Sequence, residues 1–170
     1  MRLKNQNMSK SLNSKNGFTL IEILIVLAIV AMMAALVIVA INPARQFAQA
    51  RNTQRWTHVN AILNAAHQNM IDNNGNFDFS DCPATSIPST ATNIGSVAPN
   101  LDFCGCLVPD YLGALPVDPT IGAPEGGATD CSAAYDTGYT ISQNATTGRI
   151  TVAAPEALNE TLIETISVTR

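Results

Sequence analysis

The fold is decided near the N-terminus by residues 17–41, which read GFTLIEILIVLAIVAMMAALVIVAI. From Phe18 to Ile41, 22 of 24 residues are apolar, and only Thr19 and Glu22 interrupt the run. At 1.5 Å per residue, a helix of this length spans roughly 36 Å, more than the ~30 Å hydrocarbon core of a bilayer. The sequence therefore predicts a helix that crosses a membrane over this run.

Charge is distributed unevenly on the two sides of the run. Residues 1–17 contain four basic residues and no acidic one, whereas the chain from Phe18 onward has five Arg, no Lys and 13 acids. Basic flanks remain cytoplasmic, so everything after the run is expected outside. An acidic surface repels phosphate backbones, which makes direct nucleic-acid binding unexpected. The three bases that could form a patch, Arg45, Arg51 and Arg55, follow the run closely.

Two simpler interpretations of a basic start and an apolar run fit less well. A secretory signal peptide has an apolar region of ~7–15 residues and a small-residue cleavage site. This run is longer and leads into Ile41-Asn42-Pro43. A plain single-pass anchor gives no reason for Glu22, because an ionisable residue inside a membrane is costly and is a functional hypothesis by default.

The stretch Lys15-Asn16-Gly17-Phe18-Thr19-Leu20-Ile21-Glu22 and the apolar run after it resemble the class III signal of type IV prepilins and type II secretion pseudopilins. The resemblance implies that a prepilin peptidase cuts after Gly17 and that the new N-terminus, Phe18, is then N-methylated. It also implies that Glu22 helps to assemble subunits and that the apolar segment forms the core of a fibre. An ammonium at Phe18 would attract the Glu22 carboxylate strongly in a low-dielectric environment.

The segment after the run is expected to be helical as far as residue 72. Asn42-Pro43 signals a break, which allows either one long kinked helix or a second helix with Pro43 in its first turn. Residues 44–71 contain no Gly or Pro, and Gly75 is expected to end the helix. A single apolar stripe, expected to dock on a C-terminal sheet, is formed by Trp56, Val59, Leu63, Ala66 and Met70.

Residues 78–131 are rich in Ser, Thr, Pro, Gly and Asn and are expected to form a long loop with one short helical turn near 108–112. Four cysteines restrain it, and outside the cytoplasm cysteines form disulfides. Cys104 and Cys106 are too close in sequence to pair comfortably, so Cys82 is expected to pair with one of them and Cys131 with the other, in either order. A four-thiolate zinc site is the competing interpretation, although the spacing lacks paired C-x₂₋₄-C units.

Alternating apolar and polar residues after residue 134 predict an antiparallel meander of three strands, over 135–142, 149–155 and 164–170. These stretches also resemble the closing strands of major-pilin-like proteins. The expected fold is therefore α+β, a long N-terminal helix packed on a small antiparallel sheet. The expected divisions are a leader (1–17), a membrane and fibre-core half-helix (18–41), a soluble half-helix (42–77), a disulfide-stapled loop (78–131) and a β-meander (132–170).

The sequence contains no pattern that predicts catalysis or a cofactor. His58 and His67 are nine positions apart, on opposite faces of a helix, so they are not expected to share a site. Three acids, Asp118, Glu125 and Asp130, could surround calcium as in some pseudopilins, but the continuation after Pro119 lacks the aromatic residue of that pattern. We therefore expect solvated surface acids and no metal.

These features predict a non-enzymatic structural subunit that resembles type IV pilins. Its expected partners are copies of itself, the prepilin peptidase and the inner-membrane machinery that assembles a pilus or secretion fibre. The expected location is the bacterial cytoplasmic membrane with the C-terminus outside, and then an extracellular or periplasmic fibre. The nearest alternative is a type II secretion pseudopilin. Remoter alternatives are a membrane-tethered binding module that never polymerises and an anchored enzyme.

Overall fold

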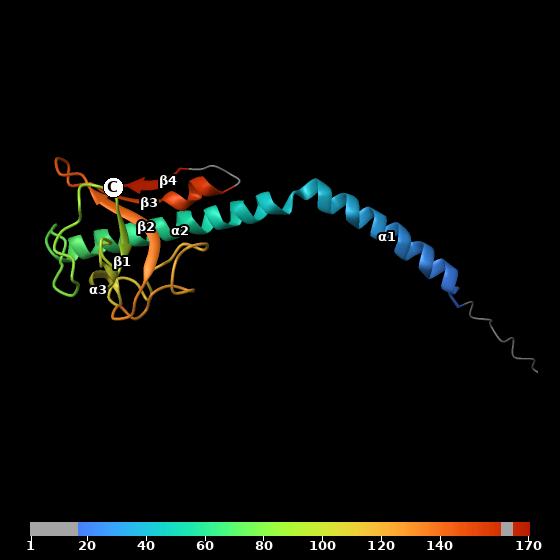
Figure 1. Cartoon of the computed structure of the whole chain (residues 1–170), viewed down its shortest axis with the longest axis horizontal. Coiled ribbons are helices and arrows are strands. Elements are labelled where there is room, and N and C mark those ends of the chain that lie inside the picture. The colour runs from blue at the N-terminus through green and yellow to red at the C-terminus, as the bar shows by residue number, and fades with distance from the viewer. Residues whose placement is uncertain (1–16, 161–164) are drawn as a thin grey trace, which may run out of the picture. The chain divides into compact units, whose positions relative to one another are not determined.

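The computed structural model describes residues 17–160 and 165–170, and the basic leader residues Arg2, Lys4, Lys10 and Lys15 lie outside the described part. The chain divides into two compact units, Met1–Asn42 and Pro43–Arg170. In the first unit, helix α1 runs over Leu20–Ile41 (Figure 1).

The predicted break lies at Asn42, whose backbone adopts a left-handed conformation with φ 48°. Helix α2 runs over Pro43–Asp72, so proline occupies its first position, where a missing N–H costs no helical hydrogen bond. At the other end, Gly75 has φ +88° and its N–H donates to the carbonyl of Met70 at 2.7 Å. Gly75 therefore ends this helix as predicted.

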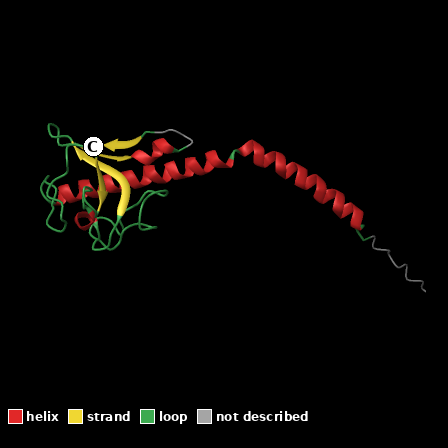
Figure 2. Cartoon of the chain, in the orientation of Figure 1, coloured by secondary structure: helices red, strands yellow, loops and turns green. Residues whose placement is uncertain are grey.

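The second unit is built on α2 and a four-stranded antiparallel sheet in the order β1-β2-β3-β4. The strands are β1 (Thr92–Gly95), β2 (Asp136–Gln143), β3 (Ile150–Ala154) and β4 (Ile166–Thr169). A short helix, α3 (Cys104–Leu107), lies in the β1–β2 connection, and a 3-10 helix, η1 (Pro155–Asn159), precedes β4. Figure 2 shows how much of the β1–β2 connection is loop. The fold is α+β, as predicted.

Two details of the prediction for residues 78–131 were wrong. The segment contains a strand, β1, which pairs with β2 through Thr92–Ile141 and Asn93–Thr140, so the sheet has four strands and not three. Only Ile94 is buried and apolar in this four-residue strand, and β1 is interrupted by a bulge, so no alternation marks it in the sequence. The helical turn occupies Cys104–Leu107, before the predicted position.

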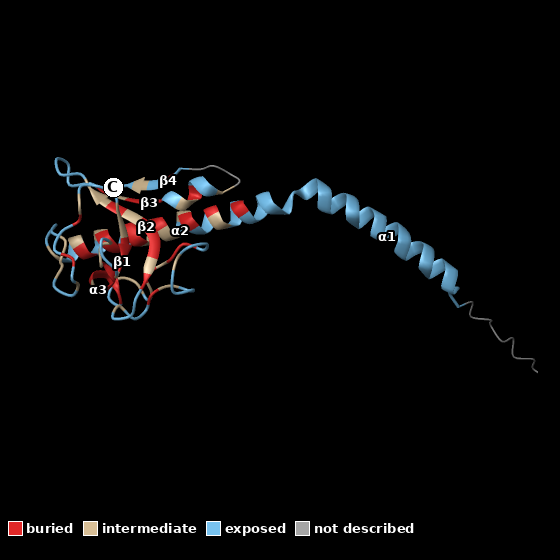
Figure 3. Cartoon of the chain, viewed as in Figure 1, coloured by how far each residue is buried: buried red, intermediate tan, exposed pale blue. Residues whose placement is uncertain are grey.

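The core lies between α2 and the sheet, and the buried side of α2 is visible in Figure 3. The predicted stripe is confirmed: Val59, Leu63 and Ala66 are fully buried, and Trp56 and Met70 are partly buried against the same cluster. From the sheet and its connections the cluster receives Ile94, Leu107, Leu115, Tyr139, Ile141, Ile150, Val152 and Ile166. The fold thus uses one face of α2 as a platform for the sheet.

Candidate functional site

The first turn of α1 is organised by Thr19. Gly17, Phe18 and Thr19 lie outside the helix, and Thr19 is its N-cap in an extended conformation, with φ −81° and ψ 150°. The Thr19 hydroxyl accepts the N–H of Glu22 at 3.2 Å, and the Thr19 carbonyl accepts the N–H of Ile23 at 3.3 Å. This is the N-cap arrangement that satisfies donors at a helix start, with an acid at the third helical position. The Gly17–Phe18 peptide bond therefore precedes the helix.

Every residue of α1 is exposed within the described part of its unit (Figure 3). The helix has 22 residues and a mean hydropathy of 3.3, so it is long and apolar enough to cross a membrane. Glu22 is its single charged residue and lies in the first turn. An exposed apolar surface on all sides of a helix is stable in lipid or in a protein assembly and costly in water.

A second polar cluster, which we call the Arg55 cluster, joins three parts of the second unit. The Arg55 side chain is fully buried and donates to both carboxylate oxygens of Asp118, at 2.6 and 3.0 Å. It also donates to Glu160 at 2.7 Å and to the Thr120 hydroxyl at 2.9 Å. Glu160 also forms an ion pair with Arg51. The cluster therefore ties α2 to the loop after Leu115 and to the end of η1.

The electrostatics of the cluster favour its charged form. Burial opposes the charge of the Arg55 guanidinium, but hydrogen bonds from Arg55 to Asp118 and Glu160 outweigh burial and raise its pKa. Burial also raises the pKa of Asp118, while the Arg55 and Thr120 hydrogen bonds more than compensate and lower it. The Arg51 hydrogen bond is the main reason why the pKa of Glu160 falls from 4.5 to about 2.

This cluster corrects two expectations from the sequence. Asp118 is not a solvated surface acid, since its side chain is fully buried and bound to Arg55. The basic patch that Arg45, Arg51 and Arg55 could have formed is absent as well, because Arg55 is buried and Arg51 is paired with Glu160. The described residues hold no group of three or more His, Cys, Asp or Glu side chains placed to bind a metal ion.

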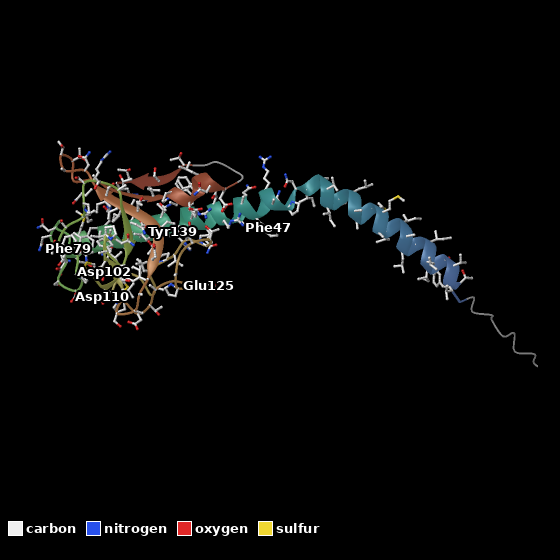
Figure 4. All side chains as sticks on the ribbon, in the orientation of Figure 1. Phe47, Phe79, Asp102, Asp110, Glu125 and Tyr139 are labelled. Carbon is white, nitrogen blue, oxygen red and sulfur yellow. A yellow bond between two sulfur atoms is a disulfide. The ribbon has the colours of Figure 1, made fainter. Side chains whose placement is uncertain are left out.

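The two histidines of α2 have different surroundings. His58 Nδ1 lies 2.8 Å from the hydroxyl of the buried Tyr139, which Figure 4 labels. Burial lowers the pKa of His58, and the nearby Val117 carbonyl and Asp118 oppose that effect. His67 instead borders a pocket with Met70 and the β2–β3 turn.

All four cysteines form disulfides, Cys82 with Cys106 and Cys104 with Cys131. The structure thus selects one of the two pairings left open by the sequence, and the four-thiolate zinc interpretation is wrong. Gly105 lies between Cys104 and Cys106, which belong to different disulfides. A Cβ built on Gly105 would lie 2.1 Å from the Asp81 carbonyl oxygen. Only a residue without a side chain lets the chain around Asp81 approach α3 so closely.

One family model matches the chain, the prokaryotic N-terminal methylation motif, over residues 12–38. No curated protein and no solved structure gives a significant match. The matched segment contains Gly17, Phe18, the Thr19 cap and Glu22, and it extends along most of α1. Together with α1, the motif indicates anchoring in the cell envelope and processing by a prepilin peptidase. The N-terminus therefore carries a prepilin-type cleavage and methylation signal, and the chain, with its long helix and four-stranded antiparallel sheet, is consistent with the type IV pilin and pseudopilin family.

Proposed function

We propose that this protein is a structural subunit that is cleaved after Gly17, N-methylated on Phe18 and polymerised into an envelope-anchored fibre of the type IV pilus kind. The observation that carries the proposal is the coincidence of three features in residues 12–41. These are the methylation motif, a scissile bond outside the helix, and an apolar helix with an acid in its first turn.

The division of the chain follows from this role. Residues 1–17 are the leader that the peptidase removes, residues 18–41 form the membrane anchor and later the fibre core, and residues 42–170 form the part outside the membrane. The position of the Gly17–Phe18 bond before the start of α1 supports cleavage there, because a bond inside a hydrogen-bonded helix is poorly accessible to a peptidase. After cleavage, the Phe18 ammonium and the Glu22 carboxylate are the two charged groups at the start of α1.

Glu22 has an assembly role because an ammonium in an apolar fibre core needs a counter-charge. Leaving one member of a buried ion pair alone costs about 3–5 kcal/mol. Even the lower figure corresponds to more than about a hundredfold in subunit affinity. Removing the carboxylate also makes the membrane run more apolar, so membrane insertion is expected to persist.

The test compares the full-length protein with Glu22→Ala and with Glu22→Asp in the producing bacterium. We expect N-terminal mass analysis to find methylated Phe18 as the first residue of the wild-type protein and of both variants. Sheared fibre yield should fall by at least about a hundredfold for Glu22→Ala and less for Glu22→Asp, which keeps the charge. Wild-type yield from Glu22→Ala would remove the assembly role, and an N-terminus at Met1 or after Ile41 would overturn the proposed processing.

The alternative of a type II secretion pseudopilin rests on the same N-terminal features. The second unit favours a pilin, because Asp118, one of the acids considered for calcium, is committed to Arg55 and the loop is held by two disulfides. Electron microscopy of the cell surface distinguishes the two roles. Long surface fibres that contain this subunit support a pilin, whereas loss of protein secretion on deletion, without such fibres, supports a pseudopilin.

A further inference from the structure

A pocket at one end of the second unit brings together Arg149 and Arg170, two basic residues outside the Arg55 cluster. It has a volume of about 340 Å³ and is bordered by Arg149 and Arg170, with Met70 and Ile71 of α2 as its apolar wall. Ile71 is 69% exposed, and Arg149 makes no ion pair with any residue that the structure describes. From residue 72 to residue 170, these are the only two basic residues against 12 acids. We call this the Arg149 pocket.

Such a pocket fits a segment that offers one carboxylate next to an apolar side chain. Two guanidinium groups can bind one carboxylate through charge-assisted hydrogen bonds. The exposed wall of Met70 and Ile71 can be covered by an apolar residue, which favours binding through the hydrophobic effect.

The chain itself contains a segment with this chemistry, the loop 121–126. Glu125 is exposed there and has no hydrogen bond or ion pair to the described residues, and Ile121, on the same loop, is 53% exposed. Figure 4 labels Glu125 on this loop. Outside the membrane run, Asp110 is the other exposed acid without such a partner in the described part of the chain, but its neighbours Tyr111 and Leu112 pack against the core.

The loop is held in place before any partner binds. The N–H of Ala123 donates to the Asp136 carbonyl at 2.8 Å, and the N–H of Asp136 donates to the Ala123 carbonyl at 2.9 Å. The Ile121 side chain lies against Gly138, where a Cβ would be 2.9 Å away from it. A preformed loop loses less conformational entropy on binding than a mobile one.

The loop and the pocket lie at opposite ends of β2. The loop pairs with Asp136, the first residue of β2, whereas Arg149 follows the turn after Gln143, the last residue. Eight residues of strand span ~26 Å, so Glu125 cannot enter the pocket of its own chain. Two complementary surfaces on different parts of one subunit make a head-to-tail contact, which produces an open helical array when the rotation does not close.

We propose that the loop 121–126 of one subunit binds the Arg149 pocket of a second copy of this chain, with Glu125 facing Arg149 and Arg170 and with Ile121 covering Met70 and Ile71. This contact rests on the proposed function, since it orders subunits within the fibre. Neighbouring subunits would then touch through their second units as well as through their α1 helices.

The test is a charge exchange in the full-length protein, read as sheared fibre yield per mature subunit in the membrane. Glu125→Arg and Arg149→Glu each place like charges opposite one another, and each should lower the yield by at least about tenfold. The double variant restores opposite charges between positions 125 and 149, while Arg170 still faces a like charge, so its yield should rise above that of either single variant. Asp110→Arg is the matched control, because it makes the same change at the other unpaired acid, and its yield should stay near the wild type.

Several results would overturn the contact. These are a wild-type yield from either single reversal, a double variant as poor as the singles, or an equal loss from Asp110→Arg. Accumulation of each variant in the membrane with both disulfides formed excludes a folding defect. If a reversal does not accumulate, Glu125→Gln and Arg149→Gln replace it, and unchanged yields from both would overturn the contact. Absence of wild-type fibres would instead overturn the proposed function.

Discussion

At the scale of single residues, Arg55 stands out in the second unit because its charged side chain is fully buried. Its guanidinium is withdrawn from water and reaches two carboxylates, an amide and a hydroxyl. A buried ion pair contributes little net stability compared with apolar side chains of the same size, but removing one partner leaves a buried charge without compensation. The cluster therefore makes the arrangement of α2 and the loop around Asp118 highly specific.

We predict that Arg55→Met lowers the free energy of unfolding by about 3–5 kcal/mol, because Asp118 would remain buried without its partner. The double variant Arg55→Met/Asp118→Leu should recover most of this loss, since both charges are then absent. Urea unfolding in detergent, followed by the fluorescence of the single Trp56, measures both values. Arg149→Met changes an exposed residue and should stay within about 0.5 kcal/mol of the wild type. A double variant as unstable as the single one would contradict this account.

The same cluster predicts how stability depends on pH. The folded protein holds the pKa of Glu160 at about 2, while its ordinary value is 4.5. Between these values the unfolded chain binds more protons than the folded one, so stability is present above about pH 4.5 and is lost as pH falls toward 2. Asp118, whose pKa is also lowered, contributes in the same direction. Thermal unfolding from pH 7 to pH 2 should show this loss, and Glu160→Gln should make it shallower. An unchanged slope in that variant would exclude Glu160 as a cause of the loss.

At the scale of elements, the sequence predicts those that repeat a pattern and misses those that depend on distant partners. The stripe of α2 and the strands β2, β3 and β4 were predicted because apolar residues recur at helical or strand spacing. Strand β1 offers a single buried apolar residue, Ile94, and becomes a strand only because β2 lies beside it.

The residues of the candidate sites also divide into those that the sequence predicts and those that only the folded chain reveals. Gly17, Phe18 and Glu22 belong to a local motif that is readable from adjacent residues, whereas the cap by Thr19 was not predicted. In contrast, Arg55 and Asp118 are 63 residues apart, and only the folded chain brings them together. The pairing of the cysteines was likewise open, because Cys104 and Cys106 are separated by one residue and sequence spacing does not distinguish them.

The segment around α3 yields a prediction about backbone packing. Gly105→Ala should lower the free energy of unfolding by about 1–3 kcal/mol, because its Cβ would be 2.1 Å from the Asp81 carbonyl oxygen and the chain would have to shift. Gly113→Ala is the control, since no atom lies within 4 Å of a Cβ placed there. Thermal unfolding of the oxidised protein measures both. Equal stability of the two variants would show that the chain around Asp81 moves without cost.

At the scale of the whole molecule, the two units suit different environments: α1 is apolar on all sides, whereas the second unit has a hydrophobic core of its own. All the residues of the hydrophobic core cluster belong to Pro43–Arg170, whereas α1 buries none of its described residues. The large apolar surface of α1 therefore requires lipid or other subunits, and the second unit supplies the surface that faces water. The proposed cleavage after Gly17 would keep α1 and so preserve this division in the mature chain.

We predict that a variant lacking residues 1–42 is soluble in water, remains folded with both disulfides, and forms no fibres. Its melting temperature should lie within about 5 °C of the transition of the second unit in the full-length protein, which corresponds to roughly 1 kcal/mol for a domain of this size. The physical reason is that the core, the Arg55 cluster and both disulfides all lie after Pro43. Circular dichroism against temperature and sedimentation velocity provide the measurements. A melting temperature lower by more than about 10 °C would show that α1 supports the fold of the second unit, and fibres from the shortened chain would remove α1 from assembly.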